Sequence, residues 1–353
     1  MRKINRLLIT IAVIAFVAGL SPQPSRCART DSGLLVLSYH DISDAPTANF
    51  TVSQETFKAH MGYLKRAGYH SISLDSLGAW RDGSVKLPPR SVLITFDDGN
   101  RSDYEKAFPI LKEYGFSGNL FLLSDPAAYK VKQLSTQHIM EMIRSGFSMG
   151  SHGVSHQSLV GLDATALRSE ISGSKKQLEN GFGRKIHFFA YPYGNFDAIV
   201  AEAVKSSGYQ GAFTTIPGIN YRDTNPFELR RVMVGRQFTL EIFKQAIKED
   251  KDFYARRLKG QTSWNIKRGM FRAAQICLDE LFDLAQRKMT ANETLKVKDF
   301  AARAFNKMGA VLLRLGFFDE ASRQFAKAVA LKPDYLEAQK NLEHANHRMK
   351  ISN

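Results

Sequence analysis

Residues 92–99, Val-Leu-Ile-Thr-Phe-Asp-Asp-Gly, form an apolar run that ends in two carboxylates and a glycine. The run has the length of a buried strand, and a helical pattern over Tyr104–Tyr114 and a second strand-like run, Asn119–Leu123, follow it. A strand, a helix and another strand in this order predict two parallel strands joined by a crossover helix. The segment therefore indicates an α/β fold.

The same alternation of short strand-like runs and helical patterns continues from Leu34 to about Lys248. Seven or eight strand–helix units in about 215 residues fit a closed or nearly closed barrel better than an open sheet. We therefore expect a distorted (β/α) barrel of the α/β class over residues 31–248, with its chemistry at the carboxyl ends of the strands. The other expected strands are Leu34–Tyr39, Ser71–Leu74, Phe147–Gly150, Ile186–Tyr191, Ala212–Thr215 and Leu229–Val234.

After Lys248 the strand-like runs stop and the chain is predicted to be all-α. Residues 249–295 predict a helical linker region, with Cys277 as a small core residue on its apolar stripe. Residues 296–350 predict tetratricopeptide-like helices, because Ala302–Tyr335 matches the repeat pattern of about 34 residues. One such helix pair needs neighbouring helices to bury its apolar face, and residues 336–349 and 261–289 could supply them. The repeat also suggests a protein partner; a plain helical hairpin without partner binding is the alternative. The matching positions are Phe305, Met308, Gly309, Leu312, Gly316, Ala321, Phe325, Ala328 and Pro333.

Composition restricts the class of protein further. Of the 353 residues, 44% are hydrophobic and 24% are charged, which excludes a mainly disordered chain. The two cysteines, Cys27 and Cys277, cannot build a disulfide framework or a thiolate zinc site. The net charge of +15 is spread along the chain without a nucleic-acid-binding signature, so we expect no nucleic acid partner.

The N-terminus has the layout of a secretory signal peptide. A basic start precedes an apolar run over Leu7–Leu20, which is too short to cross the hydrocarbon core as a helix, and prolines follow. We expect residues 1–27 to be a signal peptide, with a retained N-terminal anchor as the alternative and the one attachment to a membrane. The protein is expected to be exported to the periplasm or cell envelope, or secreted.

Two predicted strand ends carry groups that bind metal ions. Asp97 and Asp98 end an apolar strand, where carboxylates are unfavourable unless paired or bound to a cation, and the following glycine lets the chain turn so that both reach one site. His152 and His156 follow the strand Phe147–Gly150 four residues apart, and on a helical turn they would share a face and bind one ion. Two imidazoles and one carboxylate leave open coordination positions, as in a catalytic metal site.

A third segment, residues 188–194, reads Phe-Phe-Ala-Tyr-Pro-Tyr-Gly and predicts a strand that ends in an aromatic–proline–glycine turn. The turn could form the wall of a sugar groove, with Tyr191 and Pro192 as substrate-binding residues. A backbone N–H in the turn could also stabilise a developing oxyanion. An ordinary turn is the alternative.

Together the three segments resemble the polysaccharide deacetylases of carbohydrate esterase family four, the NodB-homology domain. Order and spacing agree for Thr-Phe-Asp-Asp-Gly (95–99), His-Gly-Val-Ser-His (152–156) and Tyr-Pro-Tyr-Gly (191–194). The resemblance covers roughly residues 34–248. The additional Tyr-His-Asp-Ile at 39–42 is similar to the branch that deacetylates poly-N-acetylglucosamine in biofilms.

The resemblance implies a role for each of these residues. Asp98, His152 and His156 would hold a divalent metal ion, zinc foremost, with cobalt, nickel or iron as alternatives. Asp97 would act as general base on a metal-bound water, and the Tyr193 N–H would stabilise the tetrahedral intermediate. Acetate would leave, and the sugar would keep a free amine.

Two departures from the family pattern matter. The family often has an arginine that tethers the base, at the position of Ala190 in this chain. Arg230 or Arg231, at the end of a late strand, could replace it, with ordinary surface charge as the alternative, and Arg231 is also a candidate for substrate binding. The family's late leucine-x-histidine, the general acid, is missing. His40, at a strand end, is the candidate for a proton donor or a substrate contact.

These features predict an exported, metal-dependent deacetylase that hydrolyses the N-acetyl groups of a β-linked N-acetylhexosamine polymer similar to poly-N-acetylglucosamine. Two alternatives stay open. The first is a deacetylase of peptidoglycan or chitooligosaccharides, and the second is a catalytically weak envelope scaffold that binds partners through its helical repeat. Because both carboxylates and both imidazoles are present, the enzyme is favoured.

Overall fold

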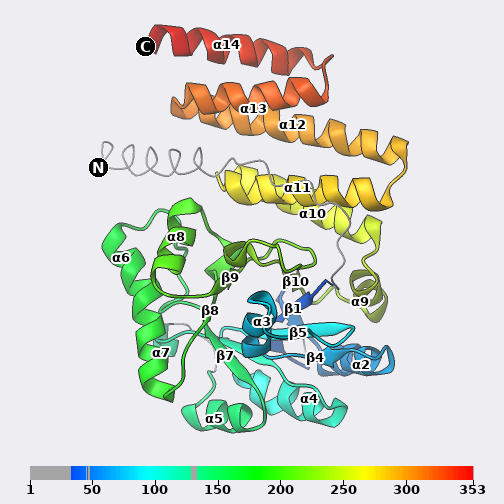
Figure 1. Ribbon diagram of the computed structural model, residues 1–353, viewed down its shortest axis with the longest axis vertical. Helices are drawn as coiled ribbons and strands as arrows, with labels where there is room; N and C mark the ends of the chain where they lie inside the picture. The colour runs from blue at the N-terminus through cyan, green and yellow to red at the C-terminus, as the bar shows by residue number, and fades with distance from the viewer. Residues whose placement is uncertain (1–32, 45, 47, 129–132, 353) are drawn as a thin grey trace. The chain divides into compact units, whose positions relative to one another are not determined.

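The computed structural model describes residues 33–352 apart from 45, 47 and 129–132, and the chain divides into two compact units after Lys248 (Figure 1). The expected signal peptide, residues 1–27, lies outside the described residues. Of the helices in the described ranges, none combines the length and the apolar composition that crossing a membrane requires.

The first unit is built on a parallel sheet that curls until its two edges meet. Its strands are ordered β10-β1-β5-β6-β7-β8-β9, and β4 lies beside β5. At the closing edge Leu229 pairs with Phe213 of β9, and Val232 of β10 pairs with Leu37 of β1. The expected distorted (β/α) barrel is therefore confirmed. The strands are β1 (Leu35–Tyr39), β4 (His70–Ser71), β5 (Ser91–Asp97), β6 (Asn119–Leu122), β7 (Ser148–Ser151), β8 (Phe188–Ala190), β9 (Gly211–Phe213) and β10 (Val232–Met233).

Helices alternate with these strands, and Figure 1 shows α2, α4, α5 and α7 around the outer side of the sheet. Polar side chains begin several of them, as when Ser53 accepts a hydrogen bond from the Thr56 N–H at the start of α2. A short pair, β2 (Asp41–Ile42) and β3 (Thr51–Val52), lies apart from the main sheet. The helices are α2 (Gln54–Arg66), α3 (Leu74–Arg81), α4 (Phe108–Tyr114), α5 (Thr136–Arg144), α6 (Ala164–Arg168), α7 (Ser174–Phe182), α8 (Ala198–Ser206) and α9 (Leu240–Ile247), with π-helical turns η1 (Asp103–Ala107) and η3 (Ser169–Gly173).

The expected strand Ser71–Leu74 is wrong except at its start. β4 ends at Ser71 and α3 begins at Leu74, because Ser73 caps this helix with its side chain. Asn119 of β6 accepts a hydrogen bond from the Leu74 N–H and so satisfies the bend between strand and helix. The bend brings α3 onto the barrel core, which contains Val36, Leu74, Leu77, Trp80, Leu93, Phe121, Phe188 and Phe213.

The second unit has five helices in its described residues. Gly309 of α12 lies against Phe325 of α13, and a Cβ at Gly309 would lie 2.7 Å from that ring, so the helix pair needs a residue without a side chain there. Cys277 is a buried core residue of this unit, as expected. The unit is consistent with a tetratricopeptide-like region. Its helices are α10 (Lys251–Lys267), α11 (Phe271–Lys288), α12 (Ala291–Leu315), α13 (Phe318–Leu331) and α14 (Leu336–Ser352).

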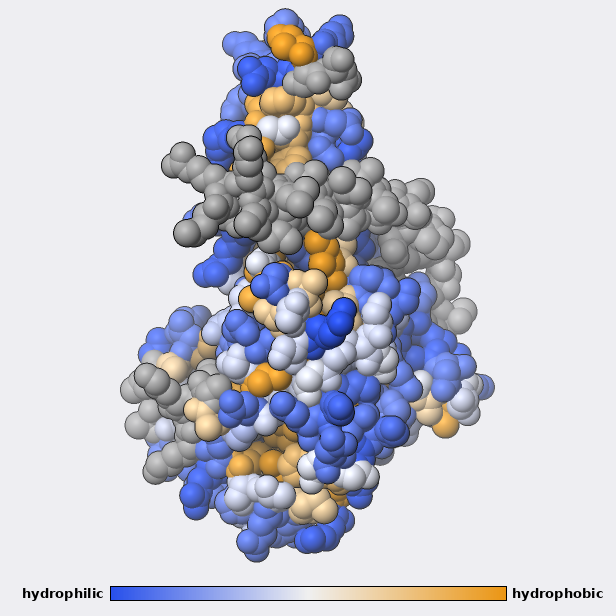
Figure 2. All heavy atoms as spheres, turned by 90° about the vertical axis from the view of Figure 1, so that its left-hand side faces the viewer, coloured by the Kyte–Doolittle hydropathy of each residue, from blue (hydrophilic) through white to orange (hydrophobic). Residues whose placement is uncertain are grey.

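Among the coloured residues of the face shown in Figure 2, hydrophilic ones predominate. The large apolar side chains instead fill the core of each unit, and few of them are exposed. This distribution is what burial of apolar area in two separate cores requires.

Candidate active site

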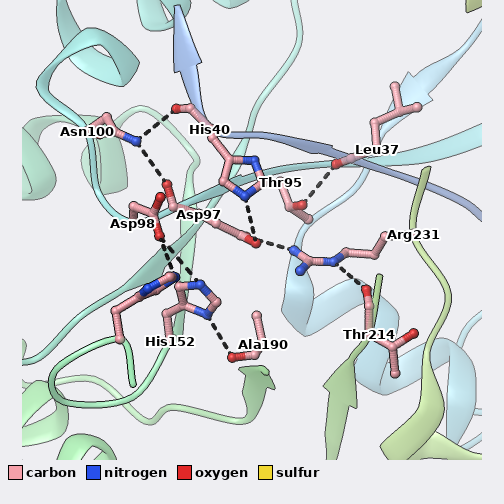
Figure 3. A network of polar contacts seen from close by, with 11 residues as sticks. Leu37, His40, Thr95, Asp97, Asp98, Asn100, His152, Ala190, Thr214 and Arg231 are labelled. Atoms are coloured by element: carbon pink, nitrogen blue, oxygen red, sulfur yellow. Dashed lines mark hydrogen bonds and ion pairs between the residues drawn. The ribbon is translucent and has the colours of Figure 1, made fainter. Parts of the chain in front are cut away.

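Two adjacent carboxylates lie at the carboxyl end of β5. Asp97 is the last residue of the strand and is buried between the ends of β1 and β6. Asp98 and Gly99 both have positive φ, +75° and +72°, so the chain turns sharply and Asp98 also reaches the barrel end. The predicted turn at the glycine therefore brings both carboxylates to one site (Figure 3).

Two imidazoles face the Asp98 carboxylate from the loop after β7. The Asp98 Oδ1 lies 3.5 Å from His152 Nε2 and 3.3 Å from His156 Nε2. The predicted helical turn is wrong, because residues 152–156 form a loop in which Gly153 has φ +90° and His156 has φ +60°. The loop, and not an i,i+4 helix face, brings the two rings together.

The His152 ring has a defined orientation. Its Nδ1 lies 2.7 Å from the carbonyl oxygen of Ala190 at the end of β8, and a carbonyl only accepts. Nδ1 therefore carries the proton, and Nε2 keeps its lone pair directed at the Asp98 side. Burial is the main cause that lowers the pKa of His152 to about 4, so the ring is neutral at physiological pH, as a metal ligand must be.

A third carboxylate, which the sequence analysis missed, holds the histidine loop. Glu170 of η3 is buried and accepts hydrogen bonds from the N–H groups of Val154 and Ser155, from the Ser155 hydroxyl and from the Gln157 amide. Burial acts to raise the pKa of Glu170, but these hydrogen bonds outweigh it and hold the pKa below its usual value. The ionised Glu170 thus fixes the backbone between His152 and His156.

Asp97 has a different set of partners. Arg231, which is 1% exposed, donates from Nη1 to Asp97 Oδ1 at 2.7 Å and from Nε to the Thr214 carbonyl at 3.0 Å (Figure 3). Burial acts to raise the pKa of Asp97, but the charge of Arg231 and its hydrogen bond to the carboxylate outweigh it and keep the pKa well below 3.8. Of the two expected functions of Arg231, this buried position fits the tether of Asp97, and it leaves no exposed surface for a substrate.

His40 lies on the other side of Asp97. Its Nε2 is 3.9 Å from Asp97 Oδ2, and Asn100 donates to the His40 carbonyl at 3.1 Å, which joins the end of β1 to the turn after β5. Burial is the main cause that lowers the pKa of His40 to about 4. The imidazole is therefore neutral beside an ionised carboxylate.

The turn after β8 buries two of the expected substrate-binding residues. Tyr191 is fully buried, its ring stacks on Phe196, and its hydroxyl donates to the Phe227 carbonyl at 3.1 Å. Pro192 is buried as well. Neither residue offers surface to a ligand, so we correct their expected role to support of the turn. Tyr193 is exposed and its ring lies 4.6 Å from the ring of His156.

Backbone strain concentrates at this end of the barrel. Among the described residues, five other than glycine have positive φ, and three of them are Asp98, His156 and Tyr193. Such conformations cost of order 1–3 kcal/mol each and persist where the surrounding structure imposes them. The fold thus places these three side chains at the expense of stability.

The Asp98 side has the donor set of a transition-metal site. One ligand atom from each of Asp98, His152 and His156 lies within 4.8 Å of the others, and all three side chains are buried. Two neutral imidazoles and a carboxylate suit zinc or a similar divalent ion and leave positions for water or substrate. The residues present therefore fit a catalytic metal ion, and Asp97, outside this set, remains free for acid–base chemistry.

Comparisons with known proteins agree with this assignment. The family model described as polysaccharide deacetylase matches residues 84–212. The chain is 33% identical over 202 residues to YxkH of Bacillus subtilis, which is named as a polysaccharide deacetylase; the match covers 57% of this chain and 71% of YxkH.

Two further relatives extend the similarity. A poly-β-1,6-N-acetyl-D-glucosamine N-deacetylase of Staphylococcus aureus is 23% identical over 270 residues, 66% of this chain and 93% of that protein. The crystal structure of BC0361, a polysaccharide deacetylase from Bacillus cereus, superimposes with a TM-score of 0.56 at 28% identity, covering 62% of this chain and 70% of that one.

Proposed function

The chain belongs to the polysaccharide deacetylase family and is thus a carbohydrate de-N-acetylase, and from that premise we propose that it acts on a β-linked N-acetylhexosamine polymer of the poly-N-acetylglucosamine type. The observation that carries the proposal is the buried cluster in which Asp98, His152 and His156 converge beside the Asp97–Arg231 pair. The similarity to the Staphylococcus aureus deacetylase supports the substrate class.

Asp98, His152 and His156 would hold a divalent ion, zinc foremost. When bound, such an ion polarises the acetyl carbonyl and lowers the pKa of a coordinated water toward about 7. The protein's own contribution is to orient the ligands, since Ala190 fixes the tautomer of His152 and Glu170 fixes the loop that carries both rings.

Asp97 is the proposed general base. Its carboxylate stays ionised because Arg231 compensates its charge, and Arg231 uses Oδ1, which leaves Oδ2 to accept a proton from the attacking water. Water oxygen then forms the new bond to the acetyl carbon. The backbone N–H of Tyr193 is the proposed donor to the oxyanion that develops on the carbonyl.

His40 completes the proton balance. The neutral imidazole at 3.9 Å from Asp97 Oδ2 receives the proton that Asp97 has taken from water and delivers it to the departing nitrogen. The carbon–nitrogen bond breaks, acetate leaves, and the sugar keeps its amine. His40 thereby fills the place of the general acid that the family pattern lacks in this chain.

The location and partner of the enzyme complete the proposal. The basic start and the apolar run of residues 7–20 support export to the periplasm or cell envelope, where a polymer substrate would lie. The tetratricopeptide-like unit would attach the deacetylase to a protein partner.

Acetate release from defined oligosaccharides tests the proposed function. Purified protein is supplied with zinc, cobalt or nickel and given hexamers of β-1,6-N-acetylglucosamine, chitohexaose, or peptidoglycan fragments. We expect release from the β-1,6 hexamer at the highest kcat/KM, loss of release on chelation, and its return with added metal. A higher kcat/KM on chitohexaose or on peptidoglycan fragments would replace the proposed substrate class with that one. No acetate release from any of the three would favour the catalytically weak envelope scaffold.

A further inference from the structure

Two exposed aromatic rings border the site. Among the described residues of the barrel unit, only three large apolar side chains are exposed: Phe50, Val85 and Tyr193. Phe50 stacks on the ring of His40 at 5.2 Å, and Tyr193 lies edge-on to His156 at 4.6 Å. The two aromatic members of this small group therefore both contact histidines of the candidate site.

The exposure of Phe50 is imposed by a braced turn. The Asn49 carbonyl accepts a hydrogen bond from the Arg236 N–H at 3.0 Å, and the next residues pair with β2 as strand β3. A Cβ at Gly235 would lie 2.1 Å from the Asn49 oxygen, so the close approach requires the glycine. Phe50 is 55% exposed, and the residues on both sides of it form backbone hydrogen bonds.

The exposure of Tyr193 is imposed in a different way. The residue has φ +59°, and the following Gly194 packs so closely on Thr215 that a Cβ there would lie 2.2 Å from the hydroxyl oxygen. The strained turn leaves the ring 54% exposed above the histidine. An apolar surface held in water by strain or bracing is typical of a binding site and not of a surface selected for stability alone.

Each ring contacts a histidine that belongs to a different half of the site. Phe50 contacts His40, which lies beside Asp97, and Tyr193 contacts His156, which lies beside Asp98. A sugar whose acetamide is attacked at the two carboxylates is therefore near one aromatic ring in each half of the site. Pyranose rings present an apolar C–H face that packs on aromatic rings.

We propose that Phe50 and Tyr193 form a two-sided platform that stacks on the sugar residues flanking the one that reacts. The platform rests on the proposed function, because it assigns the positions of the same polymer. Since the Phe50 side chain has no polar atom, it recognises the apolar face of the sugar ring and not the acetyl group. The site is thereby matched to an internal position of a chain of at least three sugars.

Binding without turnover tests the platform. In an Asp97→Asn background, titration calorimetry compares the β-1,6 disaccharide with the hexasaccharide. We expect Phe50→Ala to weaken hexasaccharide binding about tenfold and to remove most of the gain in affinity from disaccharide to hexasaccharide. Phe50→Trp restores the gain, Tyr193→Phe keeps it, and Val85→Ala, the matched exposed apolar residue away from the site, leaves it unchanged.

The outcomes separate this inference from the proposed function. Equal weakening of both ligands by Phe50→Ala, unchanged hexasaccharide binding, or no binding by the Asp97→Asn protein would overturn the platform. If that protein binds the hexasaccharide through Phe50 while the metal-loaded enzyme with Asp97 intact releases no acetate, the platform stands and the proposed function fails.

Discussion

Asp97 and Asp98 are neighbours in the chain, yet their surroundings differ in almost every respect. Asp97 pairs with a buried guanidinium at 2.7 Å and has one imidazole at 3.9 Å. Asp98 faces two neutral imidazole nitrogens at 3.3 and 3.5 Å. One carboxylate thus has its charge compensated by the protein, while the other has partners that are themselves cation ligands.

This difference assigns the roles. A carboxylate already paired with arginine binds a metal ion poorly, but it remains ionised and keeps one oxygen for a proton. A carboxylate grouped with imidazole lone pairs favours a cation, because lone pairs directed at one another are unfavourable without one. The Asp97 side is therefore the acid–base half of the site and the Asp98 side the metal half.

Loss of the Arg231 guanidinium should have the largest effect on the difference between the two carboxylates. Arg231→Met leaves Asp97 buried without compensation, and we expect a loss of about 3–5 kcal/mol in the free energy of unfolding of the barrel at neutral pH. The chain has two tryptophans, and Trp80 lies in the barrel core, so urea unfolding of a Trp264→Phe protein followed by fluorescence reports this unit alone.

The pH dependence of the free energy of unfolding tests whether the buried Asp97 carboxylate causes the loss of stability in Arg231→Met. With Arg231 present, the pKa of Asp97 lies below 3.8, so its stabilising contribution is present above that pH and is lost only below it. Without Arg231, burial raises the pKa of Asp97, and stability falls as pH rises through the raised value. The two proteins should differ little near pH 4 and increasingly toward pH 7; a difference independent of pH would contradict this account.

Replacement of His40 tests the acid–base half of the site. We expect His40→Ala to reduce kcat about 10²- to 10⁴-fold, because the departing nitrogen loses its proton donor, while zinc affinity stays within a few-fold. His40→Gln, which keeps a polar side chain but cannot deliver the proton, should be equally impaired. Activity that survives in His40→Ala would remove this residue from the mechanism.

Replacement of Glu170 tests the metal half of the site, and we expect a smaller effect than for His40. Glu170→Gln keeps the size of the side chain but loses an acceptor for the loop N–H groups, so we expect zinc affinity to fall about 10- to 100-fold. Competition with a chromophoric chelator measures it. Glu179→Gln is the control, because this carboxylate pairs with Lys175 and does not contact the histidine loop. Equal affinities in the two variants would contradict the positioning role.

The sequence predicts what depends on local pattern. The apolar runs predict β1, β5 and β6 because buried parallel strands need uninterrupted apolar residues, and the strand ends then predict where Asp97 and Asp98 lie. His60, which lies on the predicted barrel's first helix, is buried and contacts the Tyr39 hydroxyl and the Phe238 carbonyl.

The features of the site that the sequence does not predict depend on long-range contacts and on unusual backbone conformations. Nothing in the local sequence shows that His156 adopts φ +60°, and the spacing of the two histidines by itself indicates a helical turn. Glu170 lies fourteen residues beyond His156 and reaches the loop only through the tertiary fold. The sequence pattern does not distinguish Arg230 from Arg231 as the partner of Asp97. Only the register of the segment that closes the barrel directs Arg231 to Asp97.

The central claim, that the adjacent carboxylates divide the work, is tested most directly by a matched pair of isosteric variants. Asp97→Asn and Asp98→Asn are each analysed for bound zinc by elemental analysis and for acetate release from the β-1,6 hexamer. We predict that Asp97→Asn keeps about one zinc per chain and loses activity at least about 10³-fold, whereas Asp98→Asn loses both metal and activity. Loss of zinc in Asp97→Asn, or retention of zinc in Asp98→Asn, would contradict the division.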